Sequence, residues 1–314
     1  MGYLQNGKWI DGPRPTDASG EFRRQAAQVR DRVSADGSSG FPAAAGRYHL
    51  YVSLACPWAH RTLILRKLKG LEDVVSLSTV APVSTREGWA FDAEWPDHVN
   101  GFHHMHQVYT RARPDYSGRV TVPVLWDKQR NTIVNNESSE IIRMFNSEFA
   151  AFTDDRTDYY PARLRSEIDA VNDLVYECVN NGVYRCGFAT TQAAYERAFE
   201  RLFGALWELE ERLSRQRYLA GDAITEADWR IFPTLIRFDA VYVGHFKCNL
   251  RRIEDYPNLS NYLRELYQVP GVAETVDIAH CKRHYYMSHE TINPTRIVPV
   301  GPLLDFSRPH NRGS

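Results

Sequence analysis

Two patterns of apolar positions divide this chain of 314 residues. Before about residue 150, apolar side chains occur in short alternating or β-branched runs, which predict strands. The predicted strands cover residues 48–52, 74–80, 120–126 and 133–135. From Tyr160 onward, apolar positions recur at the helical spacing, and the predicted helices cover residues 164–179, 192–213, 226–238 and 259–267. The sequence therefore predicts an α/β region followed by an all-helical region.

The order of elements in the first region indicates its topology. A helix from Pro57 to about Gly70 separates the first two strands, and such a β-α-β unit implies a parallel pair. The last two strands have the spacing of a hairpin, and a helix over 138–145 follows them. Residues 81–118 are interpreted as an irregular insertion. The predicted parts are an N-terminal extension (1–45), the α/β domain (46–150), the helical domain (160–289) and an irregular tail (290–314).

Two local signals refine these elements. Pro123 interrupts the third predicted strand, and proline there indicates an edge, a bulge or a cis bond. Thr225 and Asp228 form a capping box at the start of the helix over 226–238, and Ile224 is placed to pack on Trp229.

Cys56 ends the first predicted strand and is followed at once by Pro57. Proline favours the first turn of a helix, so Cys56 is expected in the N-cap region. Unpaired backbone N–H groups and the helix dipole stabilise a thiolate there, which can lower a cysteine pKa from roughly 8.5 to about 3.5–7.5. The alternative is a small buried apolar residue that happens to precede a proline. The sequence therefore offers Cys56 as a candidate nucleophile.

Composition narrows the functional classes. A hydrophobic content of 43% can form a sizeable core, and the length fits two domains. A formal net charge of −1 without a basic stretch argues against nucleic acid as the main partner. The start of the chain lacks the apolar segment of a signal peptide, and no stretch approaches a membrane span. Five widely spaced cysteines without a CxxC pair fit reduced thiols, so we expect a cytoplasmic protein.

Histidines raise two further questions. His60 lies four residues after Cys56 on the predicted helix and could face the thiol, although a partly exposed or packing histidine is the simpler interpretation. His103, His104 and His106 suggest a metal site. No carboxylate or thiol is spaced with them as a metal site requires, so we expect no bound metal.

Several motifs together resemble one family. They are SLACPWAHR at 53–61, GRVTVPVLWD at 118–127, NES at 136–138, NNGVY at 180–184, RFD at 237–239, HYY at 284–286 and TINP at 291–294. In this combination the chain resembles the Xi-class glutathione transferases, the glutathionyl-hydroquinone reductases, over nearly its whole length. The resemblance implies a thioredoxin-like N-terminal domain followed by a helical glutathione-transferase domain. It also suggests a homodimer.

The resemblance implies a reaction as well. In this family a cysteine, here Cys56, attacks the glutathionyl sulfur of a glutathionylated hydroquinone, and a second glutathione then releases the enzyme. Tyr184 matches the general acid of the family, and Tyr242 and Tyr285 match further tyrosines of the substrate pocket. For all three tyrosines, packing in an apolar core is the alternative interpretation. Glutathione is therefore the expected co-substrate.

The expected glutathione site takes residues from the first domain. Val122, just before the proline, can pair its backbone with the cysteinyl part of glutathione. Glu137 and Ser138 precede a helix and can bind the γ-glutamyl amine and carboxylate, whereas N-capping by Ser138 is the structural alternative. By resemblance, Arg119 is a carboxylate partner and Trp89 a wall of the site, although a solvated arginine and a buried tryptophan remain alternatives. The resemblance adds Val120 and Thr121 to this set.

Two other functions remain open at this point. An Omega-like thioltransferase or dehydroascorbate reductase would use the same cysteine and glutathione. A non-catalytic binding protein could retain the same fold, because one fold supports several functions. The segments VNNGVY and HFKC in the helical half favour the hydroquinone reductase.

Overall fold

The computed structural model describes residues 2–12 and 16–312. These residues form two compact units. The first contains described residues 2–12, 25–157 and 279–284, and the second contains 16–24, 158–278 and 285–312. The N-terminal extension and the last helix therefore each contribute residues to both units, which differs from the predicted division into consecutive segments.

The first unit is built on a four-stranded sheet in the order β4-β3-β6-β7. Its strands are β3 (Tyr48–Val52), β4 (Val75–Thr79), β6 (Val124–Asp127) and β7 (Thr132–Asn135). β3 and β4 are parallel, whereas β6 is antiparallel to both β3 and β7. The predicted β-α-β pair and the predicted hairpin are both confirmed.

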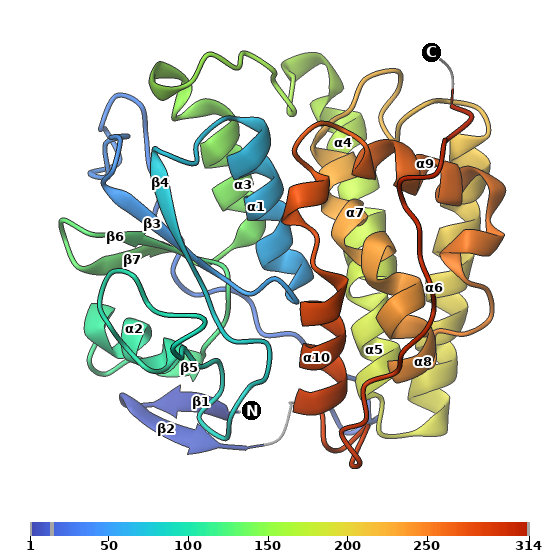
Figure 1. Ribbon diagram of the computed structural model, residues 1–314, viewed down its shortest axis with the longest axis horizontal. Helices are drawn as coiled ribbons and strands as arrows, with labels where there is room; N and C mark the ends of the chain where they lie inside the picture. Colours follow the sequence, from blue (N-terminus) through green and yellow to red (C-terminus); the bar gives the residue numbers. More distant parts are fainter. Residues whose placement is uncertain (1, 13–15, 313–314) are drawn as a thin grey trace. The chain divides into compact units, whose positions relative to one another are not determined.

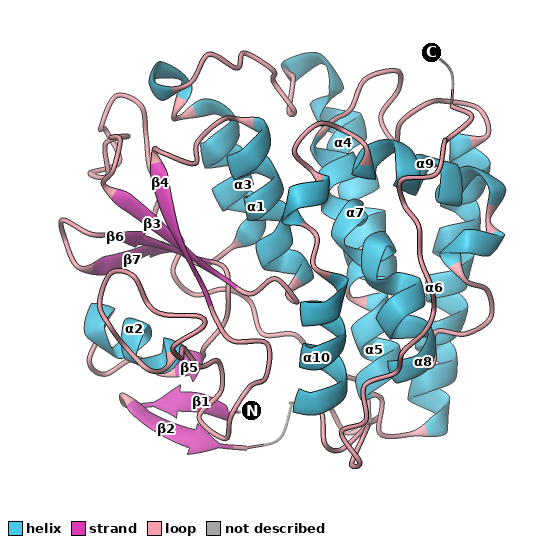
Figure 2. Ribbon diagram, in the orientation of Figure 1, coloured by secondary structure: helices cyan, strands magenta, loops and turns pink. Residues whose placement is uncertain are grey.

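Three helices accompany this sheet. α1 (Pro57–Leu68) and α3 (Ser138–Ser147) lie side by side on one face, and α2 (Met105–Ala112) lies on the other side, near β7 (Figures 1 and 2). The interpretation of residues 81–118 as wholly irregular was wrong for α2. This helix buries Met105, Val108 and Tyr109 at helical spacing, and the Gln107 side chain caps its first turn by accepting from the His104 N–H at 2.9 Å.

The N-terminal extension also contains regular structure that the sequence analysis missed. β1 (Gly2–Gln5) and β2 (Lys8–Asp11) form a hairpin, and β5 (Gly118–Arg119) completes a three-stranded sheet in the order β2-β1-β5. Asn6 and Gly7 both have positive φ, 48° and 74°, as a two-residue hairpin turn requires. The predicted strand over 120–126 is shortened to β6, and the Val122–Pro123 bond before it is cis.

The second unit is helical (Figure 2). Its α-helices are α4 (Arg165–Leu174), α5 (Gly182–Phe188), α6 (Gln192–Leu213), α7 (Glu226–Arg237), α8 (Val243–His245) and α9 (Pro257–Tyr267). π-Helical segments follow α4 and α7, at Val175–Asn180 and Phe238–Tyr242. α10 (Ile278–Ser288) contributes to both units. The predicted range of α6 is confirmed, and none of the described helices combines the length and apolar character needed to cross a membrane.

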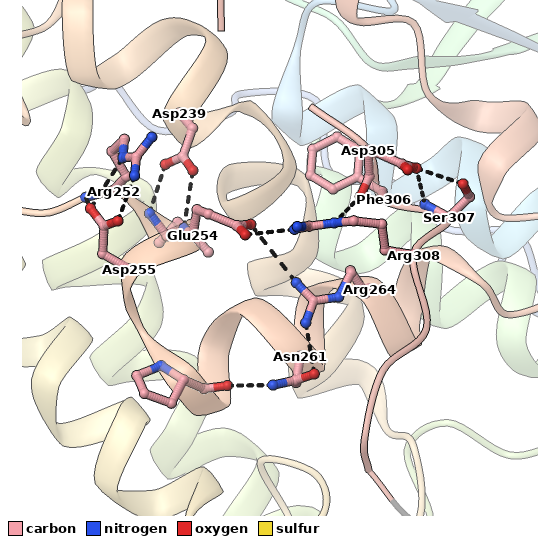
Figure 3. Close-up of polar contacts among 12 residues, drawn as sticks. Asp239, Arg252, Glu254, Asp255, Asn261, Arg264, Asp305, Phe306, Ser307 and Arg308 are labelled. Atoms are coloured by element: carbon pink, nitrogen blue, oxygen red, sulfur yellow. Dashed lines mark hydrogen bonds and ion pairs between the residues drawn. The ribbon is translucent and has the colours of Figure 1, made fainter. Parts of the chain in front are cut away.

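Short 3₁₀ turns complete the described structure. They cover Ala150–Phe152, Ala162–Leu164, Ile253–Asp255 and Ala273–Thr275. Asp239, from the RFD motif, accepts backbone N–H groups of Ile253 and Glu254 at 2.7 and 3.1 Å and so fixes the start of one of these turns (Figure 3). The predicted irregular tail has no helix or strand among its described residues. It is attached to α9 and this turn through the pairs Arg308–Glu254 and Arg312–Glu265.

Asp228 is the central residue of the predicted capping box. The carboxylate is buried and accepts from the Thr225 N–H at 2.7 Å, from the Leu219 N–H at 3.0 Å and from the Tyr262 hydroxyl at 2.7 Å. It therefore joins the start of α7 to the preceding loop and to α9. Removing it leaves several buried donors without an acceptor.

We expect Asp228→Ala to lower the free energy of unfolding by about 3 kcal/mol, because a cap and hydrogen bonds to a charged group are lost together. Asp222→Ala, at an exposed position of the same loop, is the matched control and should change stability by less than about 0.5 kcal/mol. Chemical denaturation of both variants measures the difference. Equal stability of the two variants would contradict the buried role of Asp228.

Candidate active site

Cys56 is the N-cap residue of α1, and Pro57 is its first residue, as predicted. The Cys56 side chain is partly exposed, and its Sγ donates to the Val122 carbonyl at 3.4 Å. The backbone of Cys56 is fixed on both sides, because its N–H donates to Ser53 and its carbonyl accepts from His60. The thiol therefore lies at a helix N-terminus, within reach of solvent and beside the strand-like segment that ends at Pro123.

The other four cysteines differ from Cys56 in their surroundings. Each of the five is a thiol rather than half of a disulfide. Cys186, Cys248 and Cys281 are buried, and burial raises the pKa of the Cys248 thiol. Cys178 is partly exposed but belongs to the π-helical segment after α4. Cys56 is thus the cysteine that combines exposure with a helix N-terminus.

His60 and Arg61 both point into the protein. His60 is completely buried, which fits the packing histidine and excludes the partly exposed one. Arg61 is also buried, lies over the Trp58 ring at 4.7 Å, and donates to the Ser138 hydroxyl at 3.4 Å. A buried guanidinium next to the start of α3 gives the region a fixed positive charge. The sequence analysis did not assign a role to Arg61, because the position of an arginine on a predicted helix does not show whether its side chain is buried.

The start of α3 brings together two of the predicted glutathione ligands. Glu137 is the N-cap residue of α3, so the alternative interpretation of Ser138 as the N-cap was wrong. The Glu137 carboxylate accepts from the Ser139 N–H at 2.9 Å and from its hydroxyl at 2.8 Å. Ser138 is buried at the first position of the helix. A helix N-terminus with a serine hydroxyl and a buried arginine beside it suits an anionic carboxylate, and Glu137 supplies a negative charge for an amine.

The segment before cis-Pro123 is held by a buried network from α2. The Tyr109 hydroxyl donates to the Thr121 carbonyl at 2.9 Å and accepts from the Asn136 side chain at 3.0 Å. Burial raises the pKa of Tyr109, so its hydroxyl stays protonated and remains a donor. Val120 and Val122 are buried on either side of Thr121. Tyr109 and Asn136 therefore position the backbone that faces Cys56. Sequence reasoning missed Tyr109 because α2 was not predicted, and it named Asn136 only as part of the NES motif, without a role.

Trp89 and Arg119 complete the predicted set in the first unit. Trp89 is partly exposed and stacks on His284, with ring centroids 4.6 Å apart and an interplanar angle of 18°. His284 is fixed in turn, because its Nδ1 donates to the Pro82 carbonyl at 2.9 Å. Arg119 lies in β5, where its carbonyl accepts from the Tyr116 hydroxyl at 3.2 Å. The rigid stack makes Trp89 suitable as a wall for a ligand.

The three predicted tyrosines come together in the second unit. The hydroxyl of Tyr285 lies 2.6 Å from that of Tyr184 and 3.1 Å from that of Tyr242. All three side chains are buried. Burial, followed by the neighbouring tyrosines, raises the pKa of Tyr285 well above its ordinary range. Tyr285 therefore keeps its proton and links the other two hydroxyls.

The backbone around these tyrosines is unusual in a way that the sequence did not reveal. Tyr242 lies in one π-helical segment, and the other π-helical segment precedes α5, which carries Tyr184. π-Bulges frequently occur at functional sites because they change the direction of side chains within a helix. Arg24 of the N-terminal extension lies 4.8 Å above the Tyr184 ring and donates to Asn181 at 2.7 Å. The extension thus contributes directly to the surroundings of Tyr184.

Each unit has its own chemical capacity. The first presents a cysteine thiol at a helix N-terminus, a backbone segment held before a cis-proline, and a helix start suited to a carboxylate and an amine. The second presents three linked phenol groups in an aromatic environment. A thioredoxin-like unit with a partly exposed thiol at a helix N-terminus, together with a helical unit, defines the class of the cysteine-containing glutathione transferases.

Comparisons with known proteins agree with this class. Residues 55–148 match the family model for the glutathione S-transferase N-terminal domain, and residues 192–265 match the one for the C-terminal domain. The glutathionyl-hydroquinone reductase YqjG of Escherichia coli is 52% identical over 99% of this chain and 98% of its own. The glutathionyl-hydroquinone reductase PcpF of Sphingobium chlorophenolicum is 55% identical over 96% of each chain. The Schizosaccharomyces pombe protein named glutathione S-transferase omega-like 2 is 48% identical over 90% of this chain and 94% of its own.

Solved structures give the same result. The glutathione-bound structure of YqjG has a TM-score of 0.92 and 50% identity, covering 99% of both chains. The Xi-class transferase of Natrialba magadii has a TM-score of 0.93 and 51% identity, covering 99% of this chain and 96% of its own. The chain belongs to the Xi-class glutathione transferases, the family of the glutathionyl-hydroquinone reductases. The fold class and the family predicted from the sequence are confirmed.

Proposed function

We propose that this protein is a glutathione-dependent reductase that cleaves glutathionyl-hydroquinones to hydroquinone and oxidised glutathione. The observation that carries the proposal is the partly exposed Cys56 thiol at the N-terminus of α1, in a chain about half identical to two glutathionyl-hydroquinone reductases over nearly full length. A single-cysteine site cannot resolve its own mixed disulfide, so it needs a thiol from solution. Glutathione is the co-substrate that supplies this thiol.

In the first step, the Cys56 thiolate attacks the sulfur that joins glutathione to the aromatic ring. A disulfide forms between Cys56 and glutathione, and the bond between sulfur and the ring carbon breaks. The electron pair of that bond stays on the ring carbon, which takes a proton and leaves as the hydroquinone. The positive end of the α1 dipole stabilises the attacking thiolate.

In the second step, the thiolate of a free glutathione attacks the glutathione sulfur of the mixed disulfide. Oxidised glutathione leaves, and Cys56 returns to the thiol form. The sum consumes one glutathionyl-hydroquinone and one glutathione and produces one hydroquinone and one oxidised glutathione. Two electrons pass from the two sulfurs to the ring, and the equation is balanced without any other reductant.

We assign the proton of the first step to Tyr184. Tyr285 can donate its hydrogen bond to the Tyr184 oxygen across 2.6 Å, which leaves the Tyr184 proton for the substrate. A hydrogen bond received by the Tyr184 oxygen also stabilises its phenolate after transfer. Tyr242 supports Tyr285 in the same way from 3.1 Å. The three tyrosines therefore act as a donor and two supporting groups.

Glutathione would be bound by the first unit. The backbone of Val122, with Val120 and Thr121 before it, pairs with the cysteinyl part of glutathione, as an added strand pairs with a sheet edge. Ser138 and the start of α3 receive the γ-glutamyl carboxylate, and Glu137 receives the amine. Arg119 binds the other carboxylate, and Trp89 forms a wall. The buried charge of Arg61 beside Ser138 adds to the attraction for the carboxylate.

An Omega-like thioltransferase is the second candidate, because the fission-yeast relative is named glutathione S-transferase omega-like 2. Both functions use the same cysteine and glutathione, and they differ in whether the leaving group needs a proton. The linked tyrosines favour the hydroquinone reaction, since a thiolate leaving group would not require them. We further propose that the protein works as a homodimer in the cytoplasm, where its five cysteines remain reduced.

The test is an intact-mass measurement after a single addition of glutathionyl-menadione, without free glutathione. We expect one glutathione per chain, located on Cys56 by peptide mapping, with release of one equivalent of the hydroquinone. Subsequent glutathione should remove the adduct and yield oxidised glutathione. Absence of the adduct, with the substrate still consumed, would contradict a mixed-disulfide mechanism.

A further inference from the structure

One group of metal-ligating side chains lies apart from the residues assigned to the reaction. It consists of Glu87, in the turn that closes with the Thr85–Gly88 bridge, and His104 and His106, at the start of α2. One donor atom from each side chain lies within 4.8 Å of the other two. The sequence analysis rejected a metal here because no carboxylate is spaced with the histidines. The fold supplies that carboxylate from 17 residues away in the chain.

Two observations favour a ligand at this cluster. Nε2 of His106 is buried and has no hydrogen-bond partner among the described residues. The Glu87 carboxylate lies 3.5 Å from Nε2 of His104. A buried imidazole nitrogen without a partner costs free energy unless a ligand satisfies it.

We propose that Glu87, His104 and His106 bind a divalent transition-metal ion, with zinc as the best match. Two imidazoles and one carboxylate form a common donor set for zinc, and a water completes four-coordination. Donor atoms about 2.1 Å from a tetrahedral zinc lie about 3.4 Å apart. The Glu87–His104 pair at 3.5 Å already matches this spacing, and the widest separation of 4.8 Å must shorten by about 1.4 Å. The two imidazoles are stacked, with centroids 5.2 Å apart, and one ring must turn to share the ion. The Glu87 side chain is 56% exposed and can turn toward it.

The surroundings of this cluster indicate what the ion would do. The Trp9 ring from β2 stacks on His106 at 5.2 Å, and its Nε1 donates to the Arg86 carbonyl at 2.9 Å. Gly88 has a φ of 83°, and a Cβ at this position would lie 2.9 Å from the Trp9 ring. The hairpin, the turn and α2 therefore meet at this point. A bound ion would hold the three elements together.

The same ion would act on a residue of the proposed glutathione site. Trp89 is two residues after Glu87, and its carbonyl accepts from the N–H of Met105, between the two histidines, at 3.0 Å. An ion that joins Glu87 to both histidines therefore restrains both sides of this hydrogen bond. The bound ion would therefore stabilise the backbone around Trp89, and this effect does not depend on whether Trp89 contacts glutathione.

The experiment uses the full chain without an affinity tag, stripped with a chelator and titrated calorimetrically with zinc chloride. We expect one equivalent of zinc per chain, with a dissociation constant on the order of micromolar or tighter and a raised melting temperature. Cobalt(II) should give the intense visible bands of a tetrahedral site. His106→Asn and Glu87→Gln should each weaken zinc binding at least about tenfold and abolish these bands.

His103→Asn is the matched control, because His103 is an exposed neighbour outside the cluster and should leave binding unchanged. Melting temperatures measured in chelator establish that each variant is folded. Glu87→Gln changes an exposed side chain, so it is the variant least expected to disturb folding. Failure of the wild type to bind zinc would overturn the proposal. Unchanged affinity in both cluster variants, or equal loss in His103→Asn, would overturn it as well.

Discussion

Cys56→Ser is expected to lower the rate of glutathionyl-menadione cleavage by at least about 10³-fold. A serine hydroxyl at a helix N-terminus is not ionised at neutral pH and cannot form the mixed disulfide, and loss of a nucleophile removes most of an enzyme's rate enhancement. The measurement is steady-state release of menadiol at saturating glutathione. Binding of glutathione should persist, because the proposed contacts are made by Val122, Glu137 and Ser138, and a serine hydroxyl can keep the hydrogen bond that the Cys56 thiol donates to the Val122 carbonyl.

Cys178→Ser is the matched control for this substitution. Cys178 is the other partly exposed cysteine, but it lies in a π-helical segment rather than at the start of a helix. It should retain the wild-type rate and the capacity to form the glutathione adduct. If Cys178→Ser lost activity while Cys56→Ser kept it, the nucleophile would have been assigned to the wrong helix.

Tyr184→Phe is the second substitution with a large expected effect. It should lower kcat for glutathionyl-menadione by about 10²-fold or more, since general acids contribute about 10²–10⁴-fold. Reduction of a simple mixed disulfide should change little, because a thiolate leaves without taking a proton. The comparison of both substrates on one variant separates proton donation from damage to Cys56 or to glutathione binding.

Tyr195→Phe provides the control for loss of a tyrosine hydroxyl in the same unit. The Tyr195 hydroxyl donates to the Lys247 carbonyl at 2.7 Å and is not part of the Tyr184 network. We expect wild-type turnover of both substrates. If Tyr184→Phe lowered both activities equally, Tyr184 would have only the alternative role of packing in the apolar core.

The fold was predictable where local rules and tertiary packing agree. The capping box at Thr225 and Asp228 and the proline after Cys56 mark helix starts by local hydrogen bonding, and both starts occur where predicted. β3 follows from alternating apolar positions, and β4 follows from a run rich in β-branched residues. α2 and the N-terminal hairpin were missed, because their few apolar residues lie between glycines, prolines and polar residues that weaken the periodicity.

The candidate site divides in the same way. Cys56 could be found from two adjacent residues, because proline at the first helical position and an N-cap cysteine form a local pattern. The sequence did not reveal the roles of Arg61, Tyr109 and Asn136, because these roles depend on burial and on partners far away in the chain. The roles of the three tyrosines came from family resemblance, and the structure adds their hydroxyl contacts.

The sequence alone determined the two kinds of domain, the family and the position of Cys56 at a helix N-terminus, because periodicity, capping and short motifs act over a few residues. Only the tertiary structure decided which distant groups meet. It joined the hydroxyls of Tyr184, Tyr242 and Tyr285, and it brought Glu87 to the histidines of α2. Such contacts arise from packing between segments far apart in the chain, and no spacing along the chain encodes them.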